Sequence, residues 1–267
     1  MSTVRVASDI APLVLDRRQG AVAFLTLNRP AQYNALSEEM LAALERRLNA
    51  LGTDASVRVV VLAGAGKAFC AGHDLKQMQA KPDLAYYRRL FSDCSRLMMR
   101  IQSLPQPVIA RVHGTATAAG CQLVAACDLA VASDQARFAV SGINVGLFCA
   151  TPAVALSRNV GRKAAFEMLV TGEFIDAQAA LERGLINRCV PAERLDQEVG
   201  RLAEAIAAKP PSIIAAGKAL FYRQLQADIG TAYRLAGEAM ASNMVDKIAQ
   251  EGVAAFIEKR PPNWSAD

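Results

Sequence analysis

The chain has 267 residues, of which 52% are hydrophobic, so it can bury a sizeable core and is not an intrinsically disordered chain. Its formal net charge is +5, with 30 Lys and Arg residues dispersed among 25 Asp and Glu residues. The lack of a long basic block argues against nucleic acid as a partner, whereas a mildly basic surface favours a small polyanion. No apolar segment has the length of a membrane span.

Four apolar runs of strand length occur in the first half of the chain, and a helix-like stretch separates each from the next. This alternation is typical of the parallel sheet of an α/β fold. The first intervening helix is predicted to begin after Ser37 as its N-cap and to end near Leu51. The predicted strands are Val22–Leu27, Val57–Leu62, Val108–Val112 and Leu129–Ala132.

The most informative segment is Val112–Asp128, in which a buried strand runs into a loop of small residues that opens a helix. The first turn of a helix leaves backbone N–H groups unpaired, and the peptide dipoles add partial positive charge there. The run Ala116–Gly120 lacks bulky side chains, so a substrate oxygen can approach these N–H groups. A second small-residue loop, Gly64–Leu75, can supply another N–H. Two such donors would form an oxyanion hole.

Six cysteines lie in apolar or small-residue surroundings without a close CxxC pair, which favours buried free thiols in a reducing compartment. The stretch Met1–Asp16 lacks the apolar core of a secretory signal peptide. The sequence therefore predicts a soluble, cytoplasmic protein. Cys70 and His73 are three residues apart, as metal ligands can be, yet no second pair accompanies them, so no metal is expected.

After Pro191 the strand signals disappear and the chain is predicted to be helical. The apolar stripes of such helices need a partner surface. The three predicted C-terminal helices are Pro211–Gln226, Gly230–Ala241 and Gln250–Lys259.

Five segments, in order along nearly the whole chain, resemble the crotonase family, which is the enoyl-CoA hydratase/isomerase superfamily. No single segment is decisive, but five in order make coincidence implausible. Two stretches, Thr117–Val124 and Val145–Pro152, look most like the branch called enoyl-CoA hydratase domain-containing 3. The five segments are Asn28–Ser37, Ala68–Leu75, Pro107–Gly114, Thr171–Ala180 and Glu251–Arg260.

The resemblance implies a ββα spiral core with an acyl-CoA pocket over residues 1–208 and a C-terminal helical oligomerisation segment over residues 209–267. The apolar pattern alone does not separate this spiral from an open doubly wound sheet. The implied partners are an acyl-CoA thioester and further copies of the chain, as a trimer or a dimer of trimers. Coenzyme A enters as part of the substrate, no cofactor is bound permanently, and neither nucleic acid nor a membrane is a partner.

The resemblance also places the site. The thioester carbonyl lies between two backbone N–H groups, which match His73 and Ala119. The C-terminal Lys259 matches a lysine that reaches a nucleotide phosphate, often that of a neighbouring subunit. Residues that match segments bordering the CoA moiety are Arg29, Ala31, Ala68, Ala71, His73, Asp74, Leu75 and Lys76.

The chain departs from the family at the two catalytic glutamates that hold water in hydratases, because their positions fall on Gln122 and Gly142. An amide can hold water but has no usable proton to exchange near neutral pH, and glycine offers nothing. Glutamates at both positions are expected to raise hydration. The imidazole of His73 either turns into the pocket or stays tied to backbone or solvent. Ser141, Asn144, Cys149 and Thr151 are nearby but need an activating partner to act as bases.

The sequence therefore predicts an acyl-CoA-processing enzyme of this family with weak hydration. Isomerisation or thioester hydrolysis needs fewer acids and remains open. A non-catalytic acyl-CoA-binding protein is the alternative from another class, because the oxyanion loops are intact while both glutamates are absent.

Overall fold

The computed structural model describes residues 11–264. Its larger sheet has six strands in the order β1-β2-β3-β5-β7-β10. The first two strands form an antiparallel hairpin, and every later neighbour is parallel, as the β–α alternation predicted. The strands are β1 (Val14–Gln19), β2 (Val22–Leu27), β3 (Val59–Gly64), β5 (Val108–Val112), β7 (Leu129–Ser133) and β10 (Arg188–Val190).

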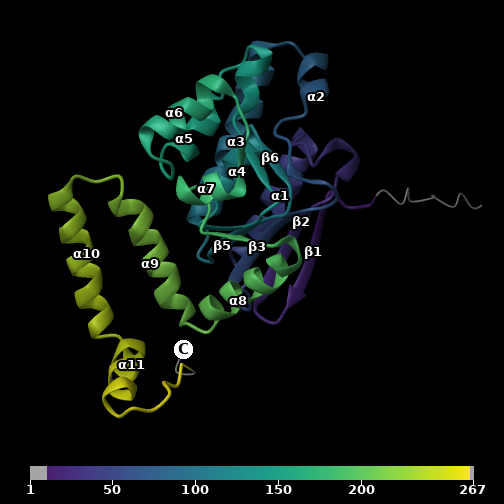
Figure 1. The fold of residues 1–267 in the computed structure, drawn as a ribbon. Helices are drawn as coiled ribbons and strands as arrows, with labels where there is room; N and C mark the ends of the chain where they lie inside the picture. Colours follow the sequence, from purple (N-terminus) through teal and green to yellow (C-terminus); the bar gives the residue numbers. More distant parts are fainter. Residues whose placement is uncertain (1–10, 265–267) are drawn as a thin grey trace, which may run out of the picture.

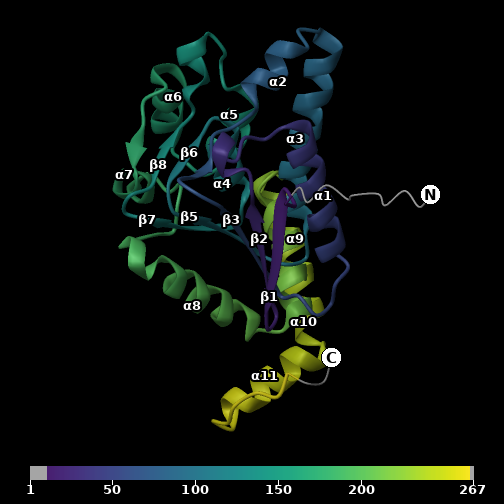
Figure 2. The ribbon, with the colours of Figure 1, turned by 90° about the vertical axis from the view of Figure 1, so that its right-hand side faces the viewer.

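Both faces of this sheet are covered, which explains why its central strands are apolar throughout. On β3, Val59 and Val61 pack towards α8 (Leu195–Ala207), whereas Val60 and Leu62 belong to the main core on the other face. Figures 1 and 2 show α8 crossing one side of the sheet, opposite α1 (Glu38–Leu51) and α3 (Leu84–Ser103). The main core therefore lies between the sheet and these two helices.

The helix α1 forms as the sequence predicts. Ser37 is its N-cap and accepts a hydrogen bond from the backbone N–H of Met40 at 3.2 Å. Gly52 is its C-cap. The apolar stripe of this helix is buried in full, with Met40, Leu41, Leu44, Leu48 and Leu51 at 3% exposure or less.

A second, smaller sheet carries the loops of interest. It has the strand order β4-β6-β8-β9, and β4, β6 and β8 run parallel. Its strands are β4 (Ala68–Cys70), β6 (Thr115–Thr117), β8 (Arg137–Ala139) and β9 (Ile175–Asp176). The helix α4 (Ala119–Ala126) follows β6 almost directly and is buried along its whole length. The remaining helices of the core are α2 (Leu75–Ala80), α5 (Ala150–Leu156), α6 (Arg162–Thr171) and α7 (Ala177–Glu182).

Three helices follow the core: α9 (Pro211–Gln224), α10 (Ile229–Met244) and α11 (Lys247–Ile257). They extend away from the two sheets (Figure 1). A cluster centred on Asp128 attaches α9 to the core. One carboxylate oxygen of Asp128 accepts from Lys218 Nζ at 2.6 Å and from the backbone N–H of Val108, and the other accepts from the Tyr222 hydroxyl. Asp128 therefore has a structural hydrogen-bonding role.

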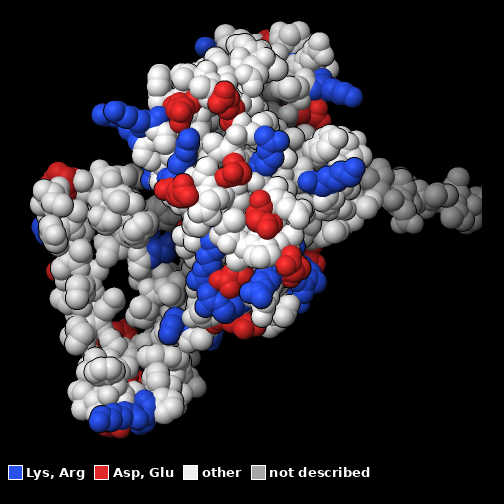
Figure 3. All heavy atoms as spheres, in the orientation of Figure 1, with Lys and Arg blue, Asp and Glu red and all other residues white. Residues whose placement is uncertain are grey.

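Beyond this attachment, the C-terminal helices expose large apolar side chains. Ile229, Tyr233 and Val245 are 74% to 75% exposed, and Phe256 is 86% exposed. In the space-filling view, basic and acidic side chains alternate over the visible face of the core, while α9–α11 show few charges (Figure 3). None of the helices within residues 11–264 has the length and apolar character needed to cross a bilayer.

Candidate active site

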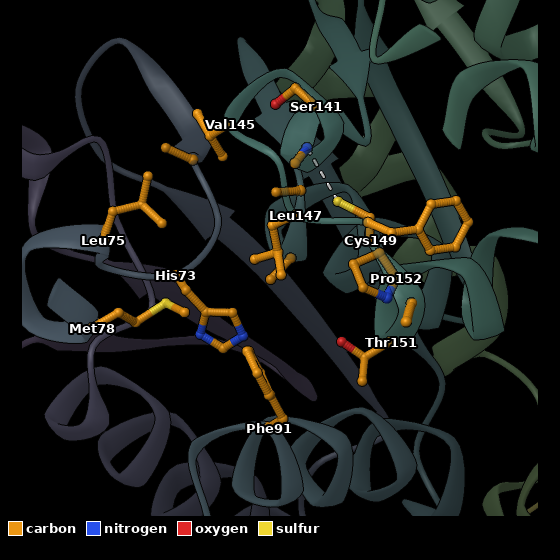
Figure 4. A pocket seen from close by; sticks show the side chains of 16 residues that line it. His73, Leu75, Met78, Phe91, Ser141, Val145, Leu147, Cys149, Thr151 and Pro152 are labelled. Atoms are coloured by element: carbon orange, nitrogen blue, oxygen red, sulfur yellow. Dashed lines mark hydrogen bonds between the residues drawn. The ribbon is translucent and has the colours of Figure 1, made fainter. Parts of the chain in front are cut away.

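A cavity of about 260 Å³ lies where the loop after β4 meets the N-terminus of α4. Ala71 and His73 line it from the first loop, and Ala118 and Ala119 from the second. The segment after β8 closes the opposite side through Ser141, Gly142 and the residues that follow (Figure 4). The two small-residue loops singled out in the sequence are therefore brought together at one cavity.

The backbone N–H groups of His73 and Ala119 are free at this junction. Among the hydrogen bonds formed by residues 11–264, none is donated by either group. Ala119 is the first residue of α4, so its N–H has no partner within the helix. An ideal Cβ at Gly72 would lie 3.1 Å from the Ala119 nitrogen. This close approach places the His73 and Ala119 segments side by side.

The packing depends on residues without bulk. Gly72 has φ +91°, which favours glycine, and a Cβ there would also lie 2.9 Å from Ala118 Cβ. A Cβ at Gly120 would overlap the carbonyl oxygen of Cys70. The small residues therefore serve the close packing of α4 on β4, and that packing also leaves the N–H groups accessible.

Ala118 is strained at the entry to α4. Its φ of 50° and ψ of −121° lie in a region that L-residues with a side chain rarely adopt. Such strain is often held at functional sites by the surrounding structure. Here Ala118 N–H donates to Ala139 O at 3.0 Å, and Ala118 O accepts from Gln122 N–H at 3.1 Å. These two bonds fix the turn that presents the Ala119 N–H.

The imidazole of His73 faces the cavity between Met78 and Phe91 (Figure 4). Its ring lies edge-on to Phe91, with centroids 5.4 Å apart. Neither ring nitrogen forms a hydrogen bond within the described residues. Burial lowers the pKa of His73 below its usual value, and the nearby backbone of Leu36 opposes this shift only in part. The imidazole is therefore neutral at pH 7, with a nitrogen lone pair available.

The two positions of the missing glutamates differ in their surroundings. Gln122 lies on α4 and is 4% exposed, and its Oε1 has no hydrogen-bond partner. Gly142 lines the cavity, and its N–H donates to Cys149 Sγ at 3.3 Å. A Cβ at Gly142 would overlap Leu147 O and lie 2.7 Å from Cys149 Sγ. A side chain at position 142 would therefore require the loop to shift.

The loop after β8 is fixed against β6 by a side-chain contact. Thr117 Oγ1 and Ser141 Oγ lie 2.8 Å apart and share a hydrogen bond. Ser141, Cys149 and Thr151 line the cavity. Asn144 does not line it, and its amide instead donates to Gly172 O at 3.3 Å. Burial raises the pKa of the Cys149 thiol, so this cysteine is not an activated nucleophile.

Of the residues expected to border CoA, Ala71, His73 and Leu75 line the cavity. Asp74 caps α2 by accepting from the N–H groups of Lys76 and Gln77, so it orders its own loop. It also pairs with Arg29 at 3.3 Å. The expected residues that lie outside the cavity lining are Arg29, Ala31, Ala68, Asp74 and Lys76.

The structure does not bring Lys259 to the cavity. This lysine is exposed, follows the end of α11 and has φ 56°. Figure 1 shows α11 at the far end of the C-terminal helices. The expected contact of Lys259 with a nucleotide phosphate stays a prediction. His113 lies in the loop after β5, and its Nε2 is 2.8 Å from Gly66 O, in keeping with a structural role.

Sequence reasoning missed the apolar wall of the cavity. Phe91 and Met78 come from α3 and α2, and Val145, Leu147, Phe148 and Pro152 come from the segment after β8. Phe91 and Met78 belong to no motif found in the sequence. The other four lie in the stretch Val145–Pro152 that resembles a branch of the family, but the sequence did not assign them to the wall of a cavity. No group of three or more His, Cys, Asp or Glu residues within the described chain is arranged to hold a metal ion.

Comparison with known proteins places these features in context. The family described as Enoyl-CoA hydratase/isomerase matches residues 17–267. Rat enoyl-CoA hydratase domain-containing protein 3, mitochondrial, is 48% identical over 253 residues, which are 95% of this chain and 84% of the relative.

Two crystal structures are also similar. That of enoyl-CoA hydratase from Mycobacterium smegmatis has a TM-score of 0.94 and 63% identity over 95% of this chain and 99% of that chain. That of human enoyl coenzyme A hydratase domain-containing protein 3 has a TM-score of 0.92 and 45% identity over 94% of this chain and 100% of that chain. These similarities confirm the fold class predicted from the sequence.

The comparisons correct the expected location. Relatives from rat, mouse, Xenopus laevis, human and zebrafish are all named mitochondrial. The prediction of a cytoplasmic protein is therefore wrong. It relied on free thiols and on a missing secretory signal, and these two features argue only against an oxidising, secreted environment.

Proposed function

Because the chain belongs to the enoyl-CoA hydratase/isomerase family, we propose that it binds an acyl-CoA thioester with the carbonyl oxygen between the N–H groups of His73 and Ala119. The observation that carries this proposal is the pair of unpaired N–H groups, on adjoining loops, at the edge of an apolar cavity. Two such donors stabilise the negative charge that develops on the oxygen when the thioester reacts.

Hydration is proposed to be weak, because no Asp or Glu lines the cavity. General acid–base groups are each worth roughly 10²–10⁴-fold in rate. Gln122 is buried beside the cavity and cannot exchange a proton near neutral pH, and Gly142 has no side chain. A water held by Gln122 would support only residual hydration.

Isomerisation is the reaction that the described side chains support better. It needs a base that removes a proton from C2 of a 3-enoyl thioester and returns it at C4, so that the double bond moves next to the carbonyl group. His73 supplies a neutral imidazole whose two nitrogens are unpartnered and whose ring faces the cavity. With the enolate oxygen held by the two N–H groups, a single base is sufficient.

A second candidate function is acyl-CoA binding without turnover. The same absence of a carboxylate from the cavity favours it. Both candidates require the thioester to bind, and only the first requires a product.

A product assay separates these functions. The purified protein is incubated with crotonyl-CoA, a 3-enoyl-CoA and butyryl-CoA, and every product is identified by mass spectrometry and chromatography. Addition of water indicates hydration, conversion of the 3-enoyl to the 2-enoyl thioester indicates isomerisation, and free CoA indicates hydrolysis. Binding without any product supports the second candidate, and absence of binding contradicts both.

A matched pair of variants tests the oxyanion hole. Ala119→Pro removes the N–H at the first position of α4, where proline breaks no helical hydrogen bond. Ala119→Gly also changes the side chain at this position but keeps the N–H. Loss of one oxyanion donor typically lowers the rate by roughly 10²–10³-fold. Equal activity in both variants would contradict the proposed role of this N–H, provided that both have native-like circular dichroism.

We further propose that α9–α11 associate with other copies of the chain to form a trimer or a dimer of trimers. The support is the set of exposed apolar residues on α10 and α11, including Tyr233, Val245 and Phe256. Truncation before Pro211 should then give aggregated protein, whereas the full chain should have the mass of a trimer or hexamer by light scattering. A truncated chain that is monomeric and melts like the full chain would contradict this proposal.

A further inference from the structure

A second cavity, of about 250 Å³, lies beyond the first and shares one residue with it, Thr151. Three helices line both cavities. On each of them, the residue that lines the second cavity lies about one turn further along the helix. On α3 the lining changes from Phe91 to Ser95, and on α4 it changes from Ala119 to Gln122. On α5, Thr151 is followed by Ala155. Figure 4 shows Thr151 and Phe91 at the same end of the first cavity.

This arrangement gives a direction to the acyl group. If the thioester oxygen lies at the Ala119 N–H, the chain beyond it runs along α4 towards Gln122. One helical turn corresponds to about 5.4 Å, and a helical side chain tilts towards the preceding turn. Gln122 lies one turn further along α4, on the lining of the second cavity, and Thr151 lies at the passage between the two cavities.

The two cavities differ in chemistry. Aliphatic and aromatic side chains dominate the first, and none of its lining residues is charged at pH 7. The second combines methionines with polar side chains, among them Ser95, Gln102 and Gln122. Its lining has one charged residue, Arg158, and no acid. A ligand that fits both would be apolar near the thioester and polar at its far end.

Two polar groups on the lining of the second cavity are available to a ligand. Gln122 Oε1 is buried without a hydrogen-bond partner, which is costly unless water or a ligand satisfies the group. Arg158 is exposed, donates from one guanidinium nitrogen to Val154 O at 2.8 Å, and forms no ion pair with a carboxylate of residues 11–264. Both polar groups line the same cavity.

We propose that the distal part of the acyl group enters this second cavity past Thr151 and that the preferred acyl group ends in a carboxylate, which pairs with Arg158. The ligand class is a monothioester of CoA with a medium-length dicarboxylic acid. Guanidinium groups recognise carboxylates through paired N–H donors. The inference rests on the proposed function, because it takes the thioester to lie at Ala119.

The test is a binding assay, which does not depend on turnover. Calorimetry measures the dissociation constants of butyryl-CoA, octanoyl-CoA and suberyl-CoA, the monothioester of the eight-carbon dicarboxylic acid. The wild type is expected to bind suberyl-CoA about fivefold more tightly than octanoyl-CoA, as for a partly exposed ion pair. Arg158→Gln should abolish this preference. Arg162→Gln removes an exposed cation at the start of α6 that lines neither cavity, so it should keep the preference.

A blocking variant tests the route. Thr151→Phe should weaken both eight-carbon thioesters at least tenfold more than it weakens butyryl-CoA, whereas the nearly isosteric Thr151→Val should not alter the ratio of the three affinities. Unaltered binding of the eight-carbon ligands to a folded Thr151→Phe protein would overturn the route. A wild type without preference for suberyl-CoA, or a preference that survives Arg158→Gln, would overturn the carboxylate. Failure of butyryl-CoA to bind would instead contradict the proposed function itself.

Discussion

A β-carbon at Gly72 would lie 3.1 Å from the backbone nitrogen of Ala119, so the two loops that carry the proposed oxyanion donors are in direct contact. The separation of the donors is consequently set by the absence of a side chain at one position. This relationship makes Gly72 a position where stability and substrate binding should change together.

Gly72→Ala is expected to destabilise the fold by more than about 1 kcal/mol and to weaken butyryl-CoA binding, because the added methyl group pushes the loops apart and φ is +91°. Gly20→Ala is the matched control, since Gly20 also has positive φ, +55°, but has no atom within 4 Å of the added Cβ. Urea unfolding and calorimetry measure the two effects. If both variants bind butyryl-CoA like the wild type, the contact does not set the donor geometry.

Ala118→Gly is expected to stabilise the protein by about 1 kcal/mol, which reverses the usual effect of glycine. The gain arises because glycine relieves the conformation of φ 50° and ψ −121°. Ala164→Gly, within α6, should instead cost about 1 kcal/mol. Opposite shifts of the urea midpoint would support the strain at Ala118, and a loss of stability in both variants would argue against it.

Gln122→Glu and Gly142→Glu should behave differently. The first places a carboxylate on α4 beside the cavity and should raise crotonyl-CoA hydration, though by less than the roughly 10²–10⁴-fold worth of a complete acid–base group. The second should destabilise the loop without raising hydration, because its side chain would overlap Leu147 O. Gly161→Ala, with no atom near the added Cβ, controls for glycine replacement in general. A folded Gly142→Glu protein with increased hydration would contradict the crowding argument.

The free energy of unfolding should depend on the protonation of His73. Its folded-state pKa is lowered by burial, whereas its unfolded pKa is about 6.5. Below pH 6.5 the unfolded chain binds a proton that the folded protein does not, until the lowered pKa is reached. Stability present above pH 6.5 is therefore lost as the pH falls through this window.

Urea unfolding at pH 7.5 and 5.5 measures this loss. His113 is the only other histidine, and burial lowers its pKa as well. His73→Gln and His113→Gln should each remove the part of this pH dependence that the replaced histidine contributes. A loss of stability that is the same in the wild type and in His73→Gln would show that His73 is not responsible.

Much of the fold could be predicted because it is determined by long segments in which apolar residues recur with the period of a helix or a strand. The stripe of α1 and the central strands are examples, with boundaries that differ by two residues for β3. The missed strands have no such period. Five residues of β1 are exposed, and the pairing with β2 holds them in place. The strands β4, β6 and β8 have three residues each, which is too short for alternation to be recognised.

Part of the candidate site could also be predicted from the sequence, and part could not. Its two loops could be predicted because small residues after a strand have a local signature. Phe91 could not, since only the packing of α3 on α4 brings the middle of a long helix to the cavity. The crowding at Gly142 was equally hidden, because Leu147 and Cys149 fold back on it through a short 3₁₀ segment, Ser141–Val145.

The Asp128 cluster has a consequence for the order in which the chain folds. Lys218 follows Asp128 by 90 residues, and Tyr222 follows it by 94. During synthesis, the two sheets and α8 are therefore complete before the cation that neutralises Asp128 has emerged. Until then the carboxylate is held by the Val108 N–H alone, and its burial is unfavourable. Final closure of the core should thus wait for α9, so that the nascent protein acquires its full stability only when nearly the whole chain has left the ribosome.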